Sequence, residues 1–234
     1  MDLVALLGVW DGLALAQSGN IVTGDALKPY IQDTLNELEV NEILFWLCGL
    51  VAECLQYILG GANTTYGKLR ASHGYPNPWP LTYVEIGNED QWWYGNSSYA
   101  GRLTAFHDAI KAKYPNLVII ASTDEALTGQ KPEGIWVDYH SYGPAGKFVN
   151  EFNKFDNVDR KVPYVVTEYA CVSMDNGTYL QQPTMQASVA EAVFMIGMER
   201  NSDVVQMAAY APLLQNYGGY EWKVNHRFQK RMRT

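Results

Sequence analysis

The sequence is poor in cysteine and in basic residues, and both shortages exclude classes of protein. Its 234 residues contain three cysteines, Cys48, Cys54 and Cys171. This odd number without metal-ligand spacing argues against a disulfide framework or a zinc site. Seventeen Lys and Arg against 25 Asp and Glu give a formal net charge of −8. That charge argues against nucleic acid or an anionic membrane as a partner.

The sequence also lacks a signal peptide and a membrane span. Met1 leads directly into the apolar run 4–10, with no basic region before it. The apolar stretch 43–59 contains Glu53, and a charge inside a bilayer is costly, so we expect a buried helix or an inserted segment there. Three N-x-[ST] sequons weakly favour a secreted glycoprotein; they lie at Asn63, Asn96 and Asn176. If the parent protein is extracellular, its own N-terminus precedes Met1.

Short apolar runs alternate with longer amphipathic segments along the chain. This alternation predicts a parallel α/β fold, either an open sheet with helices on both sides or a closed barrel. The predicted strands are 4–10, 83–86, 117–121, 136–139, 164–167 and 204–210, and the predicted helices are 24–38, 98–113, 148–155 and 184–199. A closed barrel of this kind has eight strands, so the sequence supplies two too few.

Two glutamates lie just after the ends of predicted strands. Glu89 comes after 83–86 and Glu168 after 164–167, and the two are 79 positions apart in the sequence. The carboxyl ends of barrel strands form the active-site face, and glycosidases need two carboxyl groups there. Most strand-end glutamates are ordinary surface residues, so it is the combination of the two that favours a glycosidase.

A third strand end carries His140 and Tyr142. They lie two residues apart and therefore share one face of a strand, where either could bond a sugar hydroxyl or a catalytic carboxylate. A histidine with a purely structural role is the alternative. Cys171 has no histidine nearby in the sequence, so we expect it to serve packing.

Seven stretches together resemble the α-L-arabinofuranosidases of glycoside hydrolase family 51, in their fungal or plant-like form. These stretches are 8–12, 29–39, 83–90, 106–110, 138–142, 167–170 and 209–216. The resemblance implies Glu89 as general acid and base and Glu168 as nucleophile of a retaining double displacement. It further implies that Asn88 contacts the sugar 2-hydroxyl and that His140 and Tyr142 line the arabinose subsite.

The same resemblance implies an incomplete (β/α)8 TIM-type barrel. Residues 1–222 would supply strands three to eight, while the first two strands and a C-terminal β-sandwich would be missing, so the chain would be truncated at both ends. Residues 40–56 interrupt the resemblance like a short intron read through in frame, with a family-specific insertion as the alternative. The basic segment 223–234 has no counterpart in the family.

The function expected from the sequence is release of terminal α-L-arabinofuranosyl groups from arabinoxylan, arabinan or similar polysaccharides, without metal or cofactor. One alternative is another retaining glycosidase of the same clan, such as a β-xylosidase or an endoglucanase. The other is a truncated and inactive fragment, because missing strands leave sheet edges open.

Overall fold

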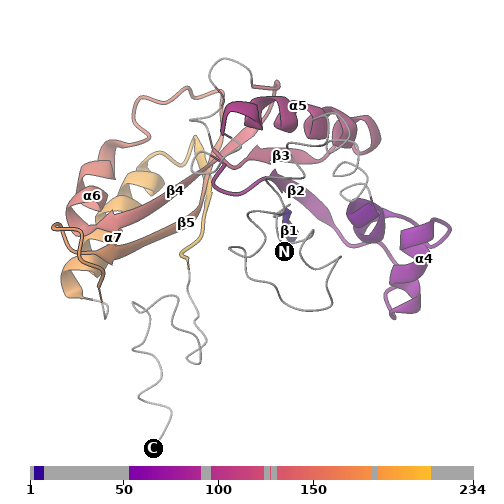
Figure 1. The fold of residues 1–234 in the computed structure, drawn as a ribbon, viewed down its shortest axis with the longest axis horizontal. Helices are drawn as coiled ribbons and strands as arrows, with labels where there is room; N and C mark the ends of the chain where they lie inside the picture. The colour runs from indigo at the N-terminus through magenta and orange to yellow at the C-terminus, as the bar shows by residue number, and fades with distance from the viewer. Residues whose placement is uncertain are drawn as a thin grey trace, which may run out of the picture. The chain divides into compact units, whose positions relative to one another are not determined.

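The computed structural model describes residues 3–7, 53–90, 96–123, 127, 131–180 and 184–211, and of residues 3–7 and 96–98 only the backbone. The chain divides into two compact units, Met1–Ile135 and Trp136–Thr234. Of the six strands among these described residues, three lie in each unit (Figure 1).

The first unit contains three parallel strands, β1 (Leu3–Leu7), β2 (Leu81–Ile86) and β3 (Val118–Ala121). Their carboxyl ends are level, because Ile86 pairs with Leu7 on one side and with Ala121 on the other. Helix α5 (Asn96–Lys113) buries one face against this unit's core. The buried residues of that face recur at the spacing of helical turns. They are Tyr99, Leu103, Phe106 and Ile110.

Arg70 holds the remaining helices of the first unit together. It lies in α4 (Thr65–Ser72), which Thr64 caps by accepting the Gly67 N–H. Its buried guanidinium donates to the carbonyls of Tyr57 and Ile58, in the helix 53–59, and to those of the loop after α4. The loop carbonyls belong to Tyr75 and Pro76. A buried arginine is tolerated here because carbonyl oxygens satisfy its charge.

The second unit contains the parallel strands β4 (Trp136–Pro144), β5 (Tyr164–Ser173) and β6 (Val205–Ala208). Helix α6 (Ala145–Asn150), the 3-10 turn Glu151–Asn153 and helix α7 (Met185–Arg200) lie beside β4 and β5 (Figure 1). Phe148, Phe155 and Phe194 are buried between these helices and the strands and meet ring to ring.

The predicted α/β organisation and all six predicted strands are confirmed. The first strand, predicted over 4–10, is confirmed over 4–7, since residues 8–10 lie outside the described residues. The boundaries differ most in β4 and β5, which continue to Pro144 and Ser173 instead of ending at 139 and 167. The polar residues there are strand residues because neighbouring side chains pair with them. Helices 98–113, 148–155 and 184–199 are confirmed within a few residues, although a 3-10 turn completes the second.

Helix α4 was not predicted. For the apolar stretch 43–59 a buried helix was one of two alternatives, and residues 53–59 are helical. Helix 24–38 and residues 40–52 lie outside the described residues. Residues 53–56 lie in the helical segment 53–59, in which Leu55 is buried and the Gln56 side chain accepts the Tyr66 N–H. No helix among the described residues has the length and apolar character needed to cross a membrane.

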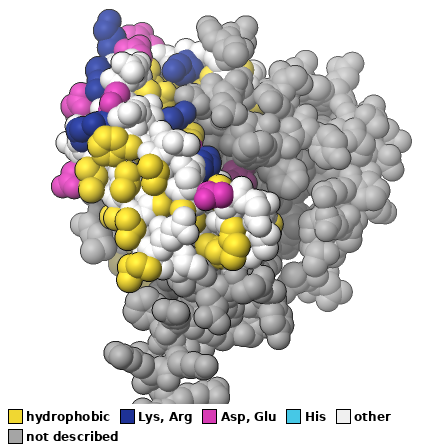
Figure 2. Space-filling view, turned by 90° about the vertical axis from the view of Figure 1, so that its left-hand side faces the viewer, with side chains coloured by type: hydrophobic (Ala, Val, Ile, Leu, Met, Phe, Trp, Pro, Cys, Tyr) yellow, Lys and Arg dark blue, Asp and Glu magenta, His cyan; other side chains and the backbone are white. Residues whose placement is uncertain are grey.

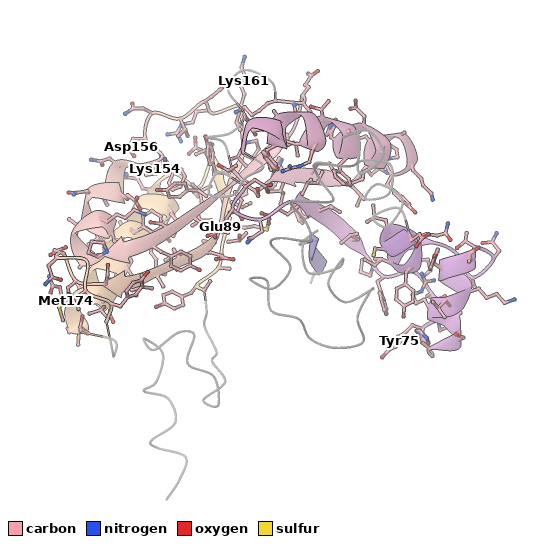
Figure 3. The ribbon with its side chains drawn as sticks, in the orientation of Figure 1. Tyr75, Glu89, Lys154, Asp156, Lys161 and Met174 are labelled. Atoms are coloured by element: carbon pink, nitrogen blue, oxygen red, sulfur yellow. The ribbon has the colours of Figure 1, made fainter. Side chains whose placement is uncertain are left out.

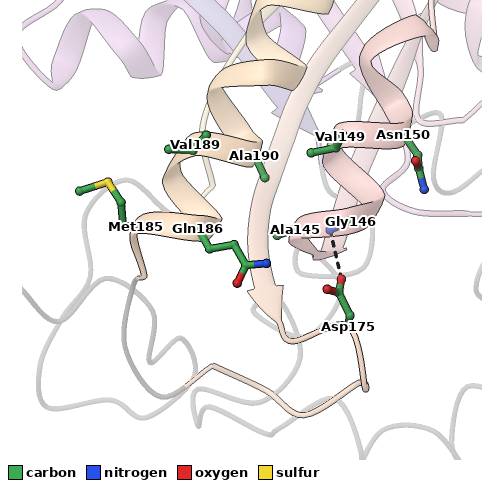
Figure 4. A pocket seen from close by; sticks show the side chains of 9 residues that line it. All are labelled: Ala145, Gly146, Val149, Asn150, Asp175, Met185, Gln186, Val189 and Ala190. Carbon is green, nitrogen blue, oxygen red and sulfur yellow. Dashed lines mark hydrogen bonds between the residues drawn. The ribbon is translucent and has the colours of Figure 1, made fainter.

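The outer side of α6 and α7 exposes hydrophobic side chains (Figure 2). A hollow of about 470 Å³ lies between the two helices, lined by Val149, Met185 and Val189 among others (Figure 4). Its carboxylate, Asp175, accepts the Gly146 N–H at the start of α6. None of the predicted site residues lines this hollow.

Glu191 of α7 ties this helix to β5 and to the segment after β6. Its Oε1 accepts the Cys171 N–H at 2.6 Å and the Tyr210 hydroxyl at 3.2 Å. Burial raises the pKa of the Glu191 carboxyl, and the two hydrogen bonds oppose that rise. Burial also raises the pKa of the Cys171 thiol to about 11, so this cysteine stays a neutral packing group.

The raised pKa of Glu191 predicts a pH-dependent stability. The folded state keeps the Glu191 proton to higher pH than the unfolded state, so stability falls as pH rises from the usual value of 4.5 through the raised one. Glu191→Gln removes the charge but leaves an Oε1 able to accept both bonds. We expect the free energy of unfolding of this variant to increase relative to that of the wild type as the pH rises through that range. Urea denaturation at several pH values measures it.

Glu191→Met is the matched variant, because it removes both the charge and the acceptor. It should change the pH slope as Glu191→Gln does, yet be less stable than the glutamine variant by about 1–3 kcal/mol at every pH. Equal pH slopes for the wild type and both variants would contradict this account.

Candidate active site

The turn after β2 brings Asn88 and Glu89 out of the sheet in an unusual backbone conformation. Gly87 has φ +93° and Glu89 has φ +50°. The left-handed region is easy for glycine and uncommon for glutamate. Glu89 is partly exposed just beyond the end of β2 (Figure 3), and Asn88 is exposed.

Asp90 stabilises this turn through hydrogen bonds. Its buried carboxylate accepts the Asn88 N–H at 3.1 Å, the Ser122 hydroxyl at 2.8 Å and the Arg102 guanidinium at 2.7 Å. Burial raises the pKa of Asp90, while these three donors lower it. The Tyr99 hydroxyl adds a second tie, since it donates to Ile86 O and accepts the Ser122 N–H. The turn is therefore fixed to both β3 and α5.

In the second unit, β4 separates its polar side chains onto two faces. Tyr139 and Ser141 donate to the two carboxylate oxygens of Glu151, on the helical side, at 2.8 and 2.6 Å. Asp138, His140 and Tyr142 alternate with them and contact residues of β5 instead. The period-two geometry of a strand thus places three polar side chains in a row.

A bulge in β5 brings two consecutive residues next to His140. Asp138 pairs with Val165 and His140 with Glu168, so one residue of β4 faces two residues of β5. Such a bulge redirects side chains that would otherwise alternate. Thr167 and Glu168 therefore both approach the imidazole, at its Nε2 and Nδ1 edges respectively.

Glu168 is held by two neighbours on β4. The Tyr142 hydroxyl donates to its Oε2 at 2.6 Å, and His140 Nδ1 lies 3.6 Å from the same oxygen. The Glu168 side chain is 33% exposed, whereas that of His140 is 3% exposed. The site therefore combines an accessible carboxylate with a buried imidazole behind it.

Three of the five predicted site residues, His140, Tyr142 and Glu168, come together in the second unit, while Asn88 and Glu89 share one turn of the first. The sequence interpretation missed the residues that hold them, which are Asp90, Asp138 and Thr167. Asp138 and Asp90 offered a signal, because each is an acidic residue within two positions of a predicted site residue. Thr167 offered none, since its role depends on the bulge.

Substitution of Gly87 should test how tightly this turn is built. A Cβ at Gly87 would lie 2.0 Å from Asp90 Oδ2, whereas one at Gly74, with a similar φ of +94°, would meet nothing within 4 Å. We expect Gly74→Ala to lose about 1–2 kcal/mol of unfolding free energy from backbone strain alone. Gly87→Ala should lose about 1–3 kcal/mol more, through displacement of Asp90. Urea denaturation measures both, and equal losses would contradict the close fit around Asp90.

Comparison with known proteins identifies two matching family models. The model of the α-L-arabinofuranosidase 1 domain matches residues 46–160, and that of the α-L-arabinofuranosidase C-terminal domain matches residues 167–226. The first match begins inside 40–56, and the second ends inside 223–234. Glu89 falls in the first match and Glu168 in the second.

Curated relatives and solved structures agree with these models. A probable α-L-arabinofuranosidase A of Aspergillus flavus is 55% identical over 96% of this chain and 33% of its own length. The α-L-arabinofuranosidase A of Aspergillus kawachii is 54% identical over 95% and 32%. This chain thus spans about a third of the length of these relatives.

Two solved structures extend the comparison. An arabinose-bound α-L-arabinofuranosidase of family 51 matches 79% of this chain and 31% of its own, with TM-score 0.71 and 32% identity. An arabinose complex of the Thermotoga maritima α-L-arabinofuranosidase shares the fold at TM-score 0.57 and 21% identity, over 70% of this chain and 40% of its own. With two family models, close fungal relatives and this structural match in agreement, the chain belongs to the α-L-arabinofuranosidases of glycoside hydrolase family 51.

Proposed function

We propose that this chain carries the catalytic pair of a retaining α-L-arabinofuranosidase, with Glu168 as nucleophile and Glu89 as general acid and base. The observation that carries the proposal is the setting of Glu168, whose Oε2 accepts the Tyr142 hydroxyl at 2.6 Å while 33% of the side chain is exposed. A nucleophilic carboxylate must be held in one orientation and still be reachable by the sugar. Glu168 meets both conditions.

The proposed reaction proceeds in two steps. Glu168 attacks the anomeric carbon while Glu89 gives its proton to the departing glycosidic oxygen, and a covalent arabinosyl-enzyme forms. Glu89 then takes a proton from water, which displaces Glu168 and releases arabinose with retained configuration. This chemistry requires the two carboxyl groups to lie about 5–5.5 Å apart, and a separation beyond about 9 Å would rule out the pair.

The turn of the first unit suits the role of Glu89. Its left-handed backbone is braced by Asp90, and strained backbone of this kind clusters at functional sites. Asn88 precedes it, is exposed, and would contact the sugar 2-hydroxyl. His140 and Tyr142 would line the arabinose subsite beside Glu168.

The six strands would be strands three to eight of an eight-stranded barrel, with two further strands and a C-terminal β-sandwich outside this chain. The substrate would be an arabinoxylan, arabinan or related polysaccharide, handled without metal or cofactor. We place the full-length parent outside the cell, because the sequon residues Asn63 and Asn176 are exposed.

A second candidate is a catalytically inactive fragment, which the coverage of about a third of the relatives' length favours. The experiment that decides between the two is covalent trapping. The 234-residue chain would be incubated with an activated arabinofuranoside whose glycosyl-enzyme hydrolyses slowly. Its peptides would then be analysed by mass spectrometry.

We expect an arabinosyl group on the peptide that contains Glu168, and none after Glu168→Gln. Glu89→Gln should still form the adduct from a substrate with a good leaving group, but its turnover of an unactivated substrate should fall by about 10²–10⁴-fold. Glu199→Gln, at an exposed position of α7, is the control and should behave as the wild type. An adduct on another residue would contradict the assignment of Glu168, and a folded chain without adduct or turnover would support the inactive fragment.

A further inference from the structure

We propose that Asp138 and Thr167 are positioning residues that hold the His140 proton on Nε2, so that the Nδ1 edge of the imidazole faces Glu168. The proposal deepens the function proposed above, because only there does Glu168 act as a nucleophile. The part of the proposal that concerns the protonation state of His140 depends only on residues of the second unit.

The Asp138 carboxylate is buried, with 0% of its side chain exposed, and it accepts hydrogen bonds on both oxygens. Oδ1 accepts the Thr167 N–H at 2.9 Å, and Oδ2 accepts the Thr167 hydroxyl. Oδ2 also lies 3.1 Å from His140 Nε2, and Thr167 Oγ1 lies 3.2 Å from the same nitrogen. We call these two residues the imidazole clamp.

The direction of these bonds fixes the proton. An ionised carboxylate can only accept, and the Thr167 hydroxyl has already given its one hydrogen to Asp138. Both oxygens next to Nε2 are therefore acceptors, and Nε2 must be the donor. A buried Nε2 without its proton would face lone pairs on both oxygens with no hydrogen between the nitrogen and either of them, which is costly.

The other edge of the ring then has a defined role. Nδ1 lies 3.6 Å from Glu168 Oε2, too far for a hydrogen bond in this arrangement but within ion-pair range. With Nε2–H held by the clamp, any second proton on the ring must enter at Nδ1, directly beside the carboxylate. Tyr142 orients Oε2 through its hydrogen bond. A ring that carries the second proton on Nδ1 would place a positive charge beside Oε2 and stabilise its negative charge before the attack.

The bulge in β5 is what makes the clamp possible. It places Thr167 beside Nε2 while Glu168 stays beside Nδ1, although consecutive strand residues normally point to opposite faces. One imidazole therefore connects the buried carboxylate to the accessible one. Removal of Asp138 should change the ring's protonation without touching Glu168.

The test is a long-range ¹H–¹⁵N NMR spectrum of the 234-residue chain with labelled histidine. The sequence contains four histidines, and His140→Gln identifies the signals of His140. We expect a protonated Nε2 in the wild type. In Asp138→Asn the side-chain oxygen would accept the Thr167 N–H, which turns the amide NH₂ towards Nε2, so the proton should move to Nδ1.

Two further variants control the interpretation. Thr167→Val leaves the Asp138 carboxylate as acceptor and should keep the proton on Nε2. Asp156→Asn removes a carboxylate of the same unit that binds Arg200 and Asn201, and should leave the His140 signals unchanged. Circular dichroism would confirm that each variant is folded.

A neutral His140 with its proton on Nδ1 in the wild type would overturn the proposal, even if Asp138→Asn did not fold. Unchanged His140 protonation in a folded Asp138→Asn would overturn it as well. Neither result depends on turnover, so failure of the clamp can be told apart from failure of Glu168 to form the covalent adduct.

Discussion

A carboxylate that leaves water must be surrounded by hydrogen-bond donors, and this requirement determines the structure around both candidate site segments. Asp90 collects donors from its own turn, from the end of β3 and from α5. Asp138 collects them from β5, and Glu191 joins β5 to the region after β6. Each of these acids links segments that are distant in sequence. Glu89 and Glu168 are held in place because the hydrogen bonds of the buried acids near them, Asp90 and Asp138, fix the surrounding backbone and side chains.

The two units reach this result in different ways. In the first unit the backbone conformation positions the site. Gly87 and Glu89 both have positive φ, and position 87 requires glycine because a Cβ there would clash with Asp90. In the second unit a strand irregularity dominates, because the bulge at Thr167 changes which side chains face β4. Both devices depart from ideal geometry, as expected where a fold presents reactive groups. The regular parts of the strands, such as Val84 and Val166, are apolar and buried and form the scaffold.

Apolar runs predicted all six strands, because a strand in a parallel sheet is covered on both faces and its sequence has few alternatives. The same criterion ended β4 at 139, because the sequence does not show that the polar side chains of Ser141 and Tyr142 are hydrogen-bonded within the fold. Helix α4 was missed because Gly67 and its charged neighbours leave little apolar periodicity, and only the Thr64 cap marked its start. Glu89 and Glu168 were found by their places after strands. Thr167 could not be found, because a bulge is a property of two paired strands and not of either sequence alone.

Arg70 also bears on the order in which the chain acquires structure. Its four carbonyl partners lie only 5, 6, 12 and 13 residues away along the sequence. Closing loops of this size costs little chain entropy, whereas pairing β1 with β2 must close a loop of more than 70 residues. The segment from Tyr57 to Pro76 is therefore a local unit of low contact order, whose formation does not wait for the sheet. In a folding chain, the contacts around Arg70 can therefore form before β1 pairs with β2.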